Sequence, residues 1–347
     1  MQFSELRIDP IVGRQVFIAE DRAGRPNDFL KLEQSERAAV DAVAVVGCPF
    51  CAGHEKQTPE TSYAVHDARG DWQVRVVPNK FPAVTSHGEK VVPTGLPFKV
   101  QPAIGAQEVI IESPRHISDI IDLSLEEFTT VLLVFRDRLR HWADDRVTRH
   151  ALIFKNVGYA AGASLEHAHS QVLALPFVPR TLGEELQGAR RFYADHQRCV
   201  YCQLLQEEIR QGLRVVAEEG PFVALCAYAA RQPYETWILP TQHAAHYGQL
   251  SEVHALSLAK LLQQLLFRLH ALLPRLSYNL VLHTAPFEQN GDSAPNGDAV
   301  EPYYHWHWEL IPRTTKLAGL EWGTGMHVNP MAPERAAAGL RGVRCEG

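Results

Sequence analysis

The sequence predicts an α+β protein in which one fold occurs twice, each copy with a curved antiparallel sheet that has helices packed on one side. Two observations predict it. One order of features occurs twice along the 347 residues: a C-x-x-C pair, a strand, a histidine, a helix, a strand and an H-x-H motif. In each copy, amphipathic helices alternate with short apolar strands. We expect the two halves to be residues 1–180 and 181–347.

The clearest part of the repeat is a strand that ends in a histidine. Residues 108–116 (EVIIESPRH) and 235–243 (ETWILPTQH) align without gaps, and each runs from a glutamate to a histidine. Apolar residues spaced three to four apart then indicate a helix in each copy, and an apolar strand follows each helix. The expected helices cover residues 125–142 and 254–273, and the expected strands cover residues 151–154 and 279–283.

Length and charge narrow the function classes. The chain is long enough for two domains with ample cores. Its formal net charge of −6 argues against a nucleic-acid surface, which needs a basic excess. The N-terminal residues lack the basic start and apolar core of a secretory signal, and polar residues interrupt the most apolar stretch, residues 256–273. We therefore expect a cytoplasmic protein without a nucleic-acid or membrane partner.

Four of the six cysteines stand in two C-x-x-C pairs. In a reducing compartment such pairs are more typical of metal ligands or redox centres than of disulfides, and neither pair has the βαβ setting of a redox motif. The repeat adds two histidines to each pair, which suits a closed, structural zinc site with four protein ligands. The predicted ligand sets are Cys48, Cys51, His116 and His167 in the first half, and Cys199, Cys202, His243 and His305 in the second.

A short polar segment, His167-Ala168-His169-Ser170-Gln171, indicates the reactive site. In an extended strand every second residue points to the same face, so His167, His169 and Gln171 would converge. The preceding residues 156–164 (NVGYAAGAS) contain glycines that can bring backbone N–H groups close to an anion. Together these features predict a phosphate site with an imidazole directed into it.

These motifs resemble those of the galactose-1-phosphate uridylyltransferase family, the transferase branch of the histidine-triad superfamily. The resemblance covers nearly the whole chain. The segments that carry it are residues 21–26 (DRAGRP), 48–51 (CPFC), 75–82 (RVVPNKFP), 113–116 (SPRH) and 156–171. The resemblance implies a histidine-triad-like fold and a ping-pong reaction. A histidine attacks the α-phosphate of a nucleotide sugar, forms a nucleotidyl-histidine and releases a hexose 1-phosphate.

Carried onto this chain, the resemblance implies that His169 is the nucleophile and that Gln171 and Ser164 stabilise the phosphate oxygens. The backbone carbonyl of His167 would hold the Nδ1 proton of His169, which frees Nε2 for attack. A glutamine at position 171, where hydrolytic relatives carry a third histidine, favours transfer between phosphates over hydrolysis. The implied substrate-binding residues are Arg22, Arg25, Asn79, Asn156, Gly162 and Lys316.

The second H-x-H motif, His305-Trp306-His307, is expected to be a structural copy without catalysis. It lacks a glycine-rich lead-in, and Glu309, which corresponds to Gln171, would place negative charge where a phosphate binds. Some family members build their second metal site from a glutamate and three histidines, with iron as a candidate ion. The residues here that correspond to that set are Glu185, His283, His305 and His307. The second cysteine pair favours the cysteine-containing zinc site instead.

The sequence leaves the substrate open. We favour a galactose-1-phosphate uridylyltransferase that uses UDP-glucose, and the family implies a homodimer in which the C-terminal segment completes the partner's active site. Lys80 stands where typical uridylyltransferases have aspartate, and residues 316–327 only loosely follow the hexose-contacting segment. The alternatives are an ADP-glucose phosphorylase or adenylyltransferase, with phosphate as acceptor, and a zinc-stabilised nucleotide-binding module without catalysis.

Overall fold

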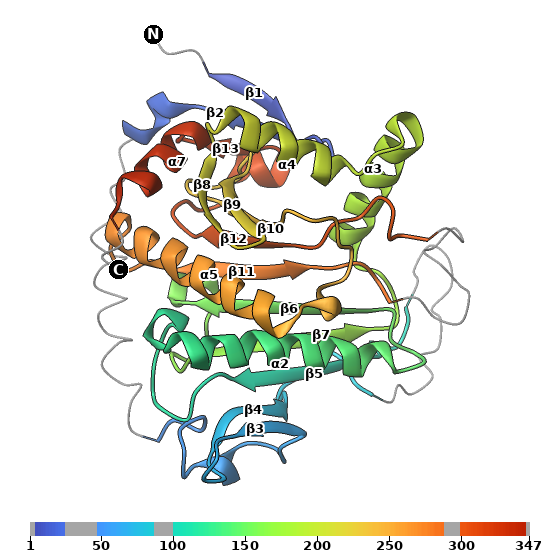
Figure 1. Cartoon of the computed structure of the whole chain (residues 1–347), viewed down its shortest axis with the longest axis vertical. Coiled ribbons are helices and arrows are strands. Elements are labelled where there is room, and N and C mark those ends of the chain that lie inside the picture. The colour runs from blue at the N-terminus through green and yellow to red at the C-terminus, as the bar shows by residue number, and fades with distance from the viewer. Residues whose placement is uncertain (1–3, 25–46, 87–99, 288–298, 345–347) are drawn as a thin grey trace.

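A ten-stranded antiparallel sheet runs through the molecule (Figure 1). The computed structural model describes residues 4–24, 47–86, 100–287 and 299–344. The spatial order of the strands is β3-β4-β5-β7-β6-β11-β12-β10-β9-β8. Their bounds are β3 (Tyr63–His66), β4 (Trp72–Pro78), β5 (Ala106–Ile111), β6 (His150–Val157), β7 (His169–Leu175), β8 (Val215–Glu219), β9 (Phe222–Cys226), β10 (Thr236–Pro240), β11 (Tyr278–His283) and β12 (His307–Pro312).

This strand order confirms the duplication. From one edge inward the first half reads β3-β4-β5-β7-β6, and from the other edge inward the second half reads β8-β9-β10-β12-β11. The halves meet where β6 pairs with β11, for example at Lys155 and Leu280. One continuous sheet therefore replaces the two separate sheets that we expected, because pairing β6 with β11 removes two exposed edges. The boundary at residue 180 stays a prediction.

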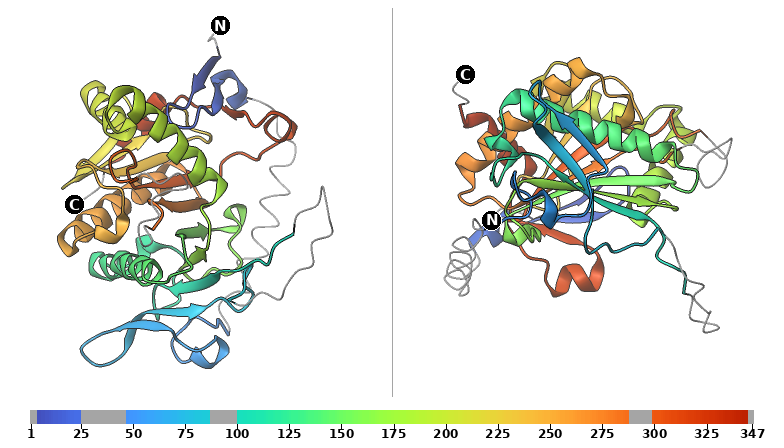
Figure 2. Two further views of the ribbon diagram at one scale, coloured as in Figure 1. Left: turned by 90° about the vertical axis from the view of Figure 1, so that its right-hand side faces the viewer. Right: turned by 90° about the horizontal axis from the view of Figure 1, so that it is seen from below.

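Two long helices cover one face of the sheet. Helices α2 (Leu125–Ala143) and α5 (Glu252–Leu272) lie side by side across it, and α7 (Pro333–Gly342) packs beside α5 (Figures 1 and 2). Helix α2 begins with a capping box in which Ser124 and Glu127 each accept from the other's backbone N–H, so its start is encoded locally. The predicted helices and the two apolar strands are confirmed within a few residues.

The two halves differ on the opposite face. Over the second half, α3 (Arg180–His196) and α4 (Val200–Gln211) pack on the strands and form a second core around Tyr201 and Trp237. Over the first half, the buried cluster on this face is small and includes Cys48 and Phe50. Among the described residues, this face of the first half therefore carries a smaller buried cluster than the corresponding face of the second half.

Segments from the N-terminal and C-terminal parts of the chain form a smaller sheet of order β1-β2-β13. Its strands are β1 (Glu5–Ile8), β2 (Gln15–Ile18) and β13 (His327–Asn329), and α6 (Gly319–Thr324) precedes β13. The short 3-10 helices are η1 (Glu20–Gly24), η2 (Glu55–Gln57), η3 (Ile120–Asp122), η4 (Tyr159–Ala161) and η5 (Tyr247–Gln249). In the part of the chain that the structure describes, no helix has the length and apolar character needed to cross a membrane.

Candidate active site

Strand β7 begins at the second histidine of the first H-x-H motif. His169 lies opposite Ile111 of β5 and Gln171 lies opposite Val109, so both side chains point to the face away from α2 and α5. Ser170, between them, points to the helix-covered face. The strand thus brings the predicted nucleophile and the predicted phosphate-binding amide to one face.

The His169 ring is held in one tautomer. Its Nδ1 lies 2.7 Å from the backbone oxygen of His167, and a carbonyl only accepts, so Nδ1 carries the proton. Burial lowers the pKa of His169; the bond to His167 raises it, and the nearby ammonium of Lys155 lowers it further. Nε2 therefore keeps an unshared electron pair, which is what a nucleophilic imidazole needs.

The glycine-rich loop between β6 and β7 is shaped by two positive φ angles, 78° at Gly158 and 84° at Gly162. A β-carbon at Gly158 would overlap Ser277, so only glycine fits there. Asn279 of β11 ties the loop down, because its Nδ2 donates to Asn156 Oδ1 at 2.8 Å and to the Ala161 oxygen at 2.9 Å. Ser164, which follows the loop, is exposed. The loop is therefore tied to β11 by two hydrogen bonds.

A buried ion pair supports β7 from the helix-covered face. Lys155 Nζ lies 2.6 Å from Glu112 and donates to the backbone oxygen of His169 at 3.1 Å, while Ser170 donates to Glu112 at 2.5 Å. The described ladder between β6 and β7 ends at the pair Phe154 and Gln171, before it reaches His169. Lys155 thus anchors the backbone of the predicted nucleophile where strand pairing stops.

The four predicted ligands of the first half come together next to β7. The potential ligand atoms of Cys48, Cys51, His116 and His167 all lie within 4.8 Å of one another. The distance from His167 Nδ1 is 3.5 Å to the sulfur of Cys48 and 3.6 Å to that of Cys51. His167 Nε2 donates to the Ser113 oxygen at 2.8 Å, so Nδ1 presents its electron pair to the thiols. The cluster can therefore hold a metal ion.

The second half repeats this arrangement. The ligand atoms of Cys199, Cys202, His243 and His305 also lie within 4.8 Å of one another. Both imidazoles donate Nε2–H to backbone oxygens, His243 to Glu301 at 2.6 Å and His305 to Pro240 at 2.9 Å. Their Nδ1 atoms lie 3.2 Å and 3.5 Å from the Cys202 sulfur. The same donor set in the same order thus forms a second cluster.

Comparison with known proteins agrees with this geometry. Residues 1–179 match the model of the galactose-1-phosphate uridyl transferase N-terminal domain, and residues 185–335 match the model of its C-terminal domain. The chain belongs to the galactose-1-phosphate uridylyltransferase family. Its relatives are nucleotidyltransferases, and so is this protein.

Two branches of the family resemble the chain over its full length. The ADP-glucose phosphorylase of Arabidopsis thaliana is 31% identical, covering 99% of this chain and 93% of that protein. The galactose-1-phosphate uridylyltransferase of Thermotoga maritima is 26% identical over 99% of both chains. The crystal structure of the Arabidopsis enzyme with bound ADP-glucose superposes with a TM-score of 0.83 at 30% identity, covering 99% of this chain and 100% of that one. A uridylyltransferase structure gives 0.73 at 26% identity, covering 98% and 97%.

In the second H-x-H motif of this family member, the second histidine is buried and stacked on another ring, so this copy of the motif is closed to solvent. His307 Nδ1 donates to the His305 oxygen at 3.1 Å, as in the first half, but the His307 ring stacks on His283 at 4.7 Å. Its exposed fraction is 1%, against 8% for His169. Glu309, at the position of Gln171, is bonded to Arg231 at 2.5 Å. This arrangement agrees with the expected structural role.

The four residues proposed for the alternative metal site do not form one cluster in this structure. His305 joins the cysteine cluster, whereas Glu185, His283 and His307 form a separate group within 4.8 Å of one another. Burial alone would lower the pKa of His283, but the carboxylates of Glu185 and Glu309 raise it to about 10. The His283 imidazolium pairs with Glu185 at 2.9 Å and Arg231 pairs with Glu309, so each of the two carboxylates already has a cationic partner.

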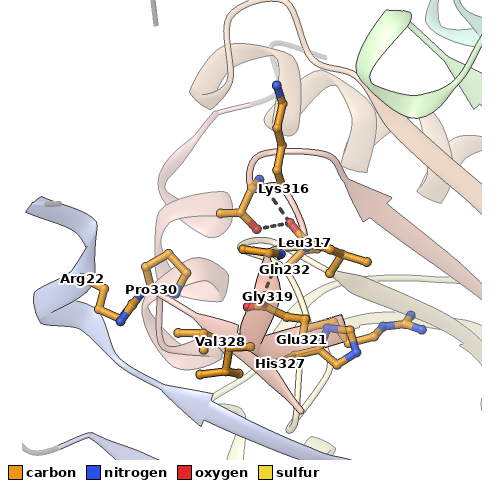
Figure 3. Close-up of a pocket in the computed structure, with 13 residues that line it drawn as sticks. Arg22, Gln232, Lys316, Leu317, Gly319, Glu321, His327, Val328 and Pro330 are labelled. Atoms are coloured by element: carbon orange, nitrogen blue, oxygen red, sulfur yellow. Dashed lines mark hydrogen bonds between the residues drawn. The ribbon is translucent and has the colours of Figure 1, made fainter. Parts of the chain in front are cut away.

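Two predicted substrate-binding residues line a pocket that does not include His169, shown in Figure 3. This cavity of about 380 Å³ is lined by Arg22 of η1, by Lys316 and by residues around α6 and β13. None of its described lining residues comes from β7. Arg22 and Lys316 thus line one pocket whose described lining does not include His169, and the Lys316 side chain points away from the other labelled residues (Figure 3). The predicted residue Arg25 lies outside the described residues.

Sequence reasoning missed several residues that shape this site. The missed residues are Gln107, Glu112, Lys155, Ser170 and Asn279. Lysine and glutamate in apolar strands are a sequence signal for a buried pair, because an unpaired charge there is costly. The partners themselves follow only from the strand order.

Proposed function

We propose that this protein transfers a nucleoside monophosphate from a nucleotide sugar through a covalent intermediate on His169. The observation that carries the proposal is the fixed tautomer, which leaves His169 Nε2 unprotonated on the same face as Gln171. Nε2 attacks the α-phosphorus and forms an N–P bond. The P–O bond to the sugar phosphate breaks, and the sugar 1-phosphate leaves with the electron pair. An oxygen of the acceptor phosphate then attacks the same phosphorus and releases the imidazole.

The neighbouring residues have distinct proposed roles. The Gln171 amide and the Ser164 hydroxyl donate to the non-bridging phosphate oxygens, which gain negative charge in the transition state. The N–H of Gly162 is already bonded to the Tyr159 oxygen at 3.0 Å, so Gly162 contributes the shape of the loop. The Asn156 amide oxygen accepts from Asn279, which leaves its NH₂ group for the substrate.

Zinc is the metal that we propose for both cysteine-histidine clusters. In a tetrahedral zinc site, sulfur and nitrogen ligands lie about 3.5 Å apart, given the usual bond lengths. The sulfur to nitrogen separations of 3.2 Å to 3.6 Å in the two clusters fit this value. Four protein ligands leave no position for a water molecule, so each zinc would be structural. The first one would tether the segment of Cys48 and Cys51 to His167 and thereby fix the start of β7.

We further propose that two copies of the chain combine to form each active site. The proposal is supported by Arg22 and Lys316, which line a pocket to which β7 contributes no described residue. Two variants that we expect to be inactive, His169→Asn and Lys316→Ala, are unfolded, mixed in equal amounts and refolded together. About half of the dimers then contain one copy of each variant, and one of the two sites in such a dimer is intact. We therefore expect about a quarter of the wild-type activity to return. Size-exclusion chromatography checks the dimer. A monomer, or a mixture as inactive as its parents, contradicts the proposal.

ADP-glucose is the donor that we propose, with inorganic phosphate as acceptor. The Arabidopsis ADP-glucose phosphorylase supports this choice through higher identity and a higher TM-score than those of the uridylyltransferases cited above. The exposed Lys80, where typical uridylyltransferases have aspartate, agrees with it. Uridylyl transfer from UDP-glucose to galactose 1-phosphate is the second candidate, supported by the full-length match to the Thermotoga enzyme.

The donor preference is measured by glucose 1-phosphate release from each nucleotide sugar. We expect kcat/KM for ADP-glucose with phosphate to exceed that for UDP-glucose with galactose 1-phosphate by about 10²-fold, because a base pocket whose buried polar groups match one base leaves them unpaired with the other. The opposite preference would establish the second candidate. Equal and negligible rates with both donors would count against both substrate proposals.

A further inference from the structure

Gln171 belongs to a chain of hydrogen bonds that starts at a backbone N–H. The N–H of Ala83 donates to Gln107 Oε1 at 2.8 Å, and Gln107 Nε2 donates to Gln171 Oε1 at 2.7 Å. Gln107 lies on β5 two residues before Val109, which is the partner of Gln171, so both amides occupy the same face. Gln107 and Gln171 therefore form a relay that leads from the backbone to the proposed phosphate site.

The backbone sets the direction of this relay. An amide side chain usually has two orientations, and its hydrogen-bond partners decide between them. A backbone N–H can only donate, so the oxygen of Gln107 must face Ala83, and its NH₂ group must face Gln171. The Gln171 oxygen then faces Gln107. Its own NH₂ group is left for the face that it shares with His169.

A second amide gives the same result independently. The N–H of Phe81 donates to Asn79 Oδ1 at 2.9 Å, which turns the Asn79 NH₂ group toward Gln171 Oε1 at 3.4 Å. Two donors, each oriented by a different backbone N–H, thus point at one oxygen. Turning the Gln171 amide over would place its NH₂ group against both donors and its oxygen toward the phosphate.

We propose that Gln107 is a positioning residue that orients the Gln171 amide, so that two N–H donors and no acceptor face the substrate phosphate. The proposal rests on the proposed function, because it assigns Gln171 to the phosphate. Gln107 itself acts only through Gln171. The orientation is set before substrate binds, so the donors need no rearrangement as charge develops in the transition state.

The test compares two substitutions of nearly the same size, Gln107→Glu and Gln107→Leu. The carboxylate of Gln107→Glu still accepts from Ala83 but has no donor, so it attracts the Gln171 NH₂ group and turns the Gln171 oxygen toward the phosphate. Gln107→Leu only releases the amide. We expect the rate of nucleotidyl-enzyme formation to fall about 10²-fold in Gln107→Glu and about 10-fold or less in Gln107→Leu. Thermal unfolding of both variants checks that the fold is retained.

A double-mutant cycle separates this effect from simple repulsion of the substrate by the new charge. A Gln171→Met background lacks the amide that Gln107 is proposed to orient. Adding Gln107→Glu in that background is therefore expected to change the rate less than threefold. An undiminished loss in that background, or a loss in Gln107→Leu as large as in Gln107→Glu, would overturn the proposal.

A binding measurement distinguishes failure of the relay from failure of the proposed function. Calorimetric titration with AMP and with adenosine reports the phosphate contact without any reaction. We expect Gln107→Glu to weaken AMP binding about tenfold and to leave adenosine binding unchanged. If the wild type forms no nucleotidyl-enzyme but Gln107→Glu weakens AMP binding and leaves adenosine binding unchanged, the relay stands and the covalent mechanism fails. Unchanged AMP affinity in Gln107→Glu overturns the relay.

Discussion

Replacing His169 by asparagine is expected to lower the rate of nucleotidyl transfer by about 10⁴-fold or more, the scale seen when a catalytic nucleophile is removed. Asparagine is the informative choice. Its amide NH₂ group can still donate to the His167 oxygen, as Nδ1 of His169 does at 2.7 Å, so the start of β7 keeps its bond. The substitution removes Nε2, the atom that we assign to attack. Initial rates of glucose 1-phosphate release measure the effect.

The second half of the chain offers a matched control. His307 stands in the second H-x-H motif and donates to the His305 oxygen as His169 donates to His167. His307→Asn therefore makes the same chemical change in the closed copy, and we expect at least a third of the wild-type rate in folded protein. Comparable losses in both variants would contradict the assignment of one catalytic half.

Replacing Cys51 by serine is expected to release one of two zinc ions and to destabilise the first half. The sulfur of Cys51 lies 3.4 Å from His116 Nδ1 and 3.6 Å from His167 Nδ1, so it is central to the cluster. Zinc binding contributes directly to folding, and we expect a loss of more than about 3 kcal/mol in the free energy of unfolding. Metal analysis of the purified protein should fall from two zinc ions per chain to one.

Two further variants make this metal prediction specific. Cys202→Ser removes the corresponding ligand of the second cluster and should also leave one zinc ion per chain. Cys226→Ala changes a buried cysteine that belongs to neither cluster, and should keep both ions. Wild-type protein with one zinc ion, or with iron in the second site, would contradict the proposed pair of zinc sites.

Local patterns predicted the elements of this fold well. Helices α2 and α5 have apolar residues at helical spacing and serine caps, and both begin and end within two residues of the expected positions. The repeated order of motifs predicted two copies of one arrangement. The joining of the copies through β6 and β11 was not predictable, because strand order across a sheet depends on tertiary pairing.

The candidate site, too, could be predicted from the sequence only in part. His169 and Gln171 both lie in β7, so their shared face followed from strand geometry alone. The expectation that the strand also includes His167 was wrong, because His167 lies in a bend before β7, where its ring joins the cysteine cluster. Lys155 and Gln107 come from β6 and β5, and their contacts with β7 depend on the strand order. The two ligand clusters were predictable in spite of their long sequence separations, because the repeat showed the same four residue types twice in the same order.

The covalent intermediate on His169 is the central claim, and intact-protein mass spectrometry tests it most directly. Enzyme incubated with ADP-glucose, without phosphate acceptor, is expected to gain the mass of one adenylyl group per chain. Peptide mapping at neutral to alkaline pH should place this group on His169, since the N–P bond is labile to acid, and adding phosphate should remove it. A mass unchanged with both ADP-glucose and UDP-glucose during measurable turnover, or a nucleotidyl group on any other residue, would contradict the account.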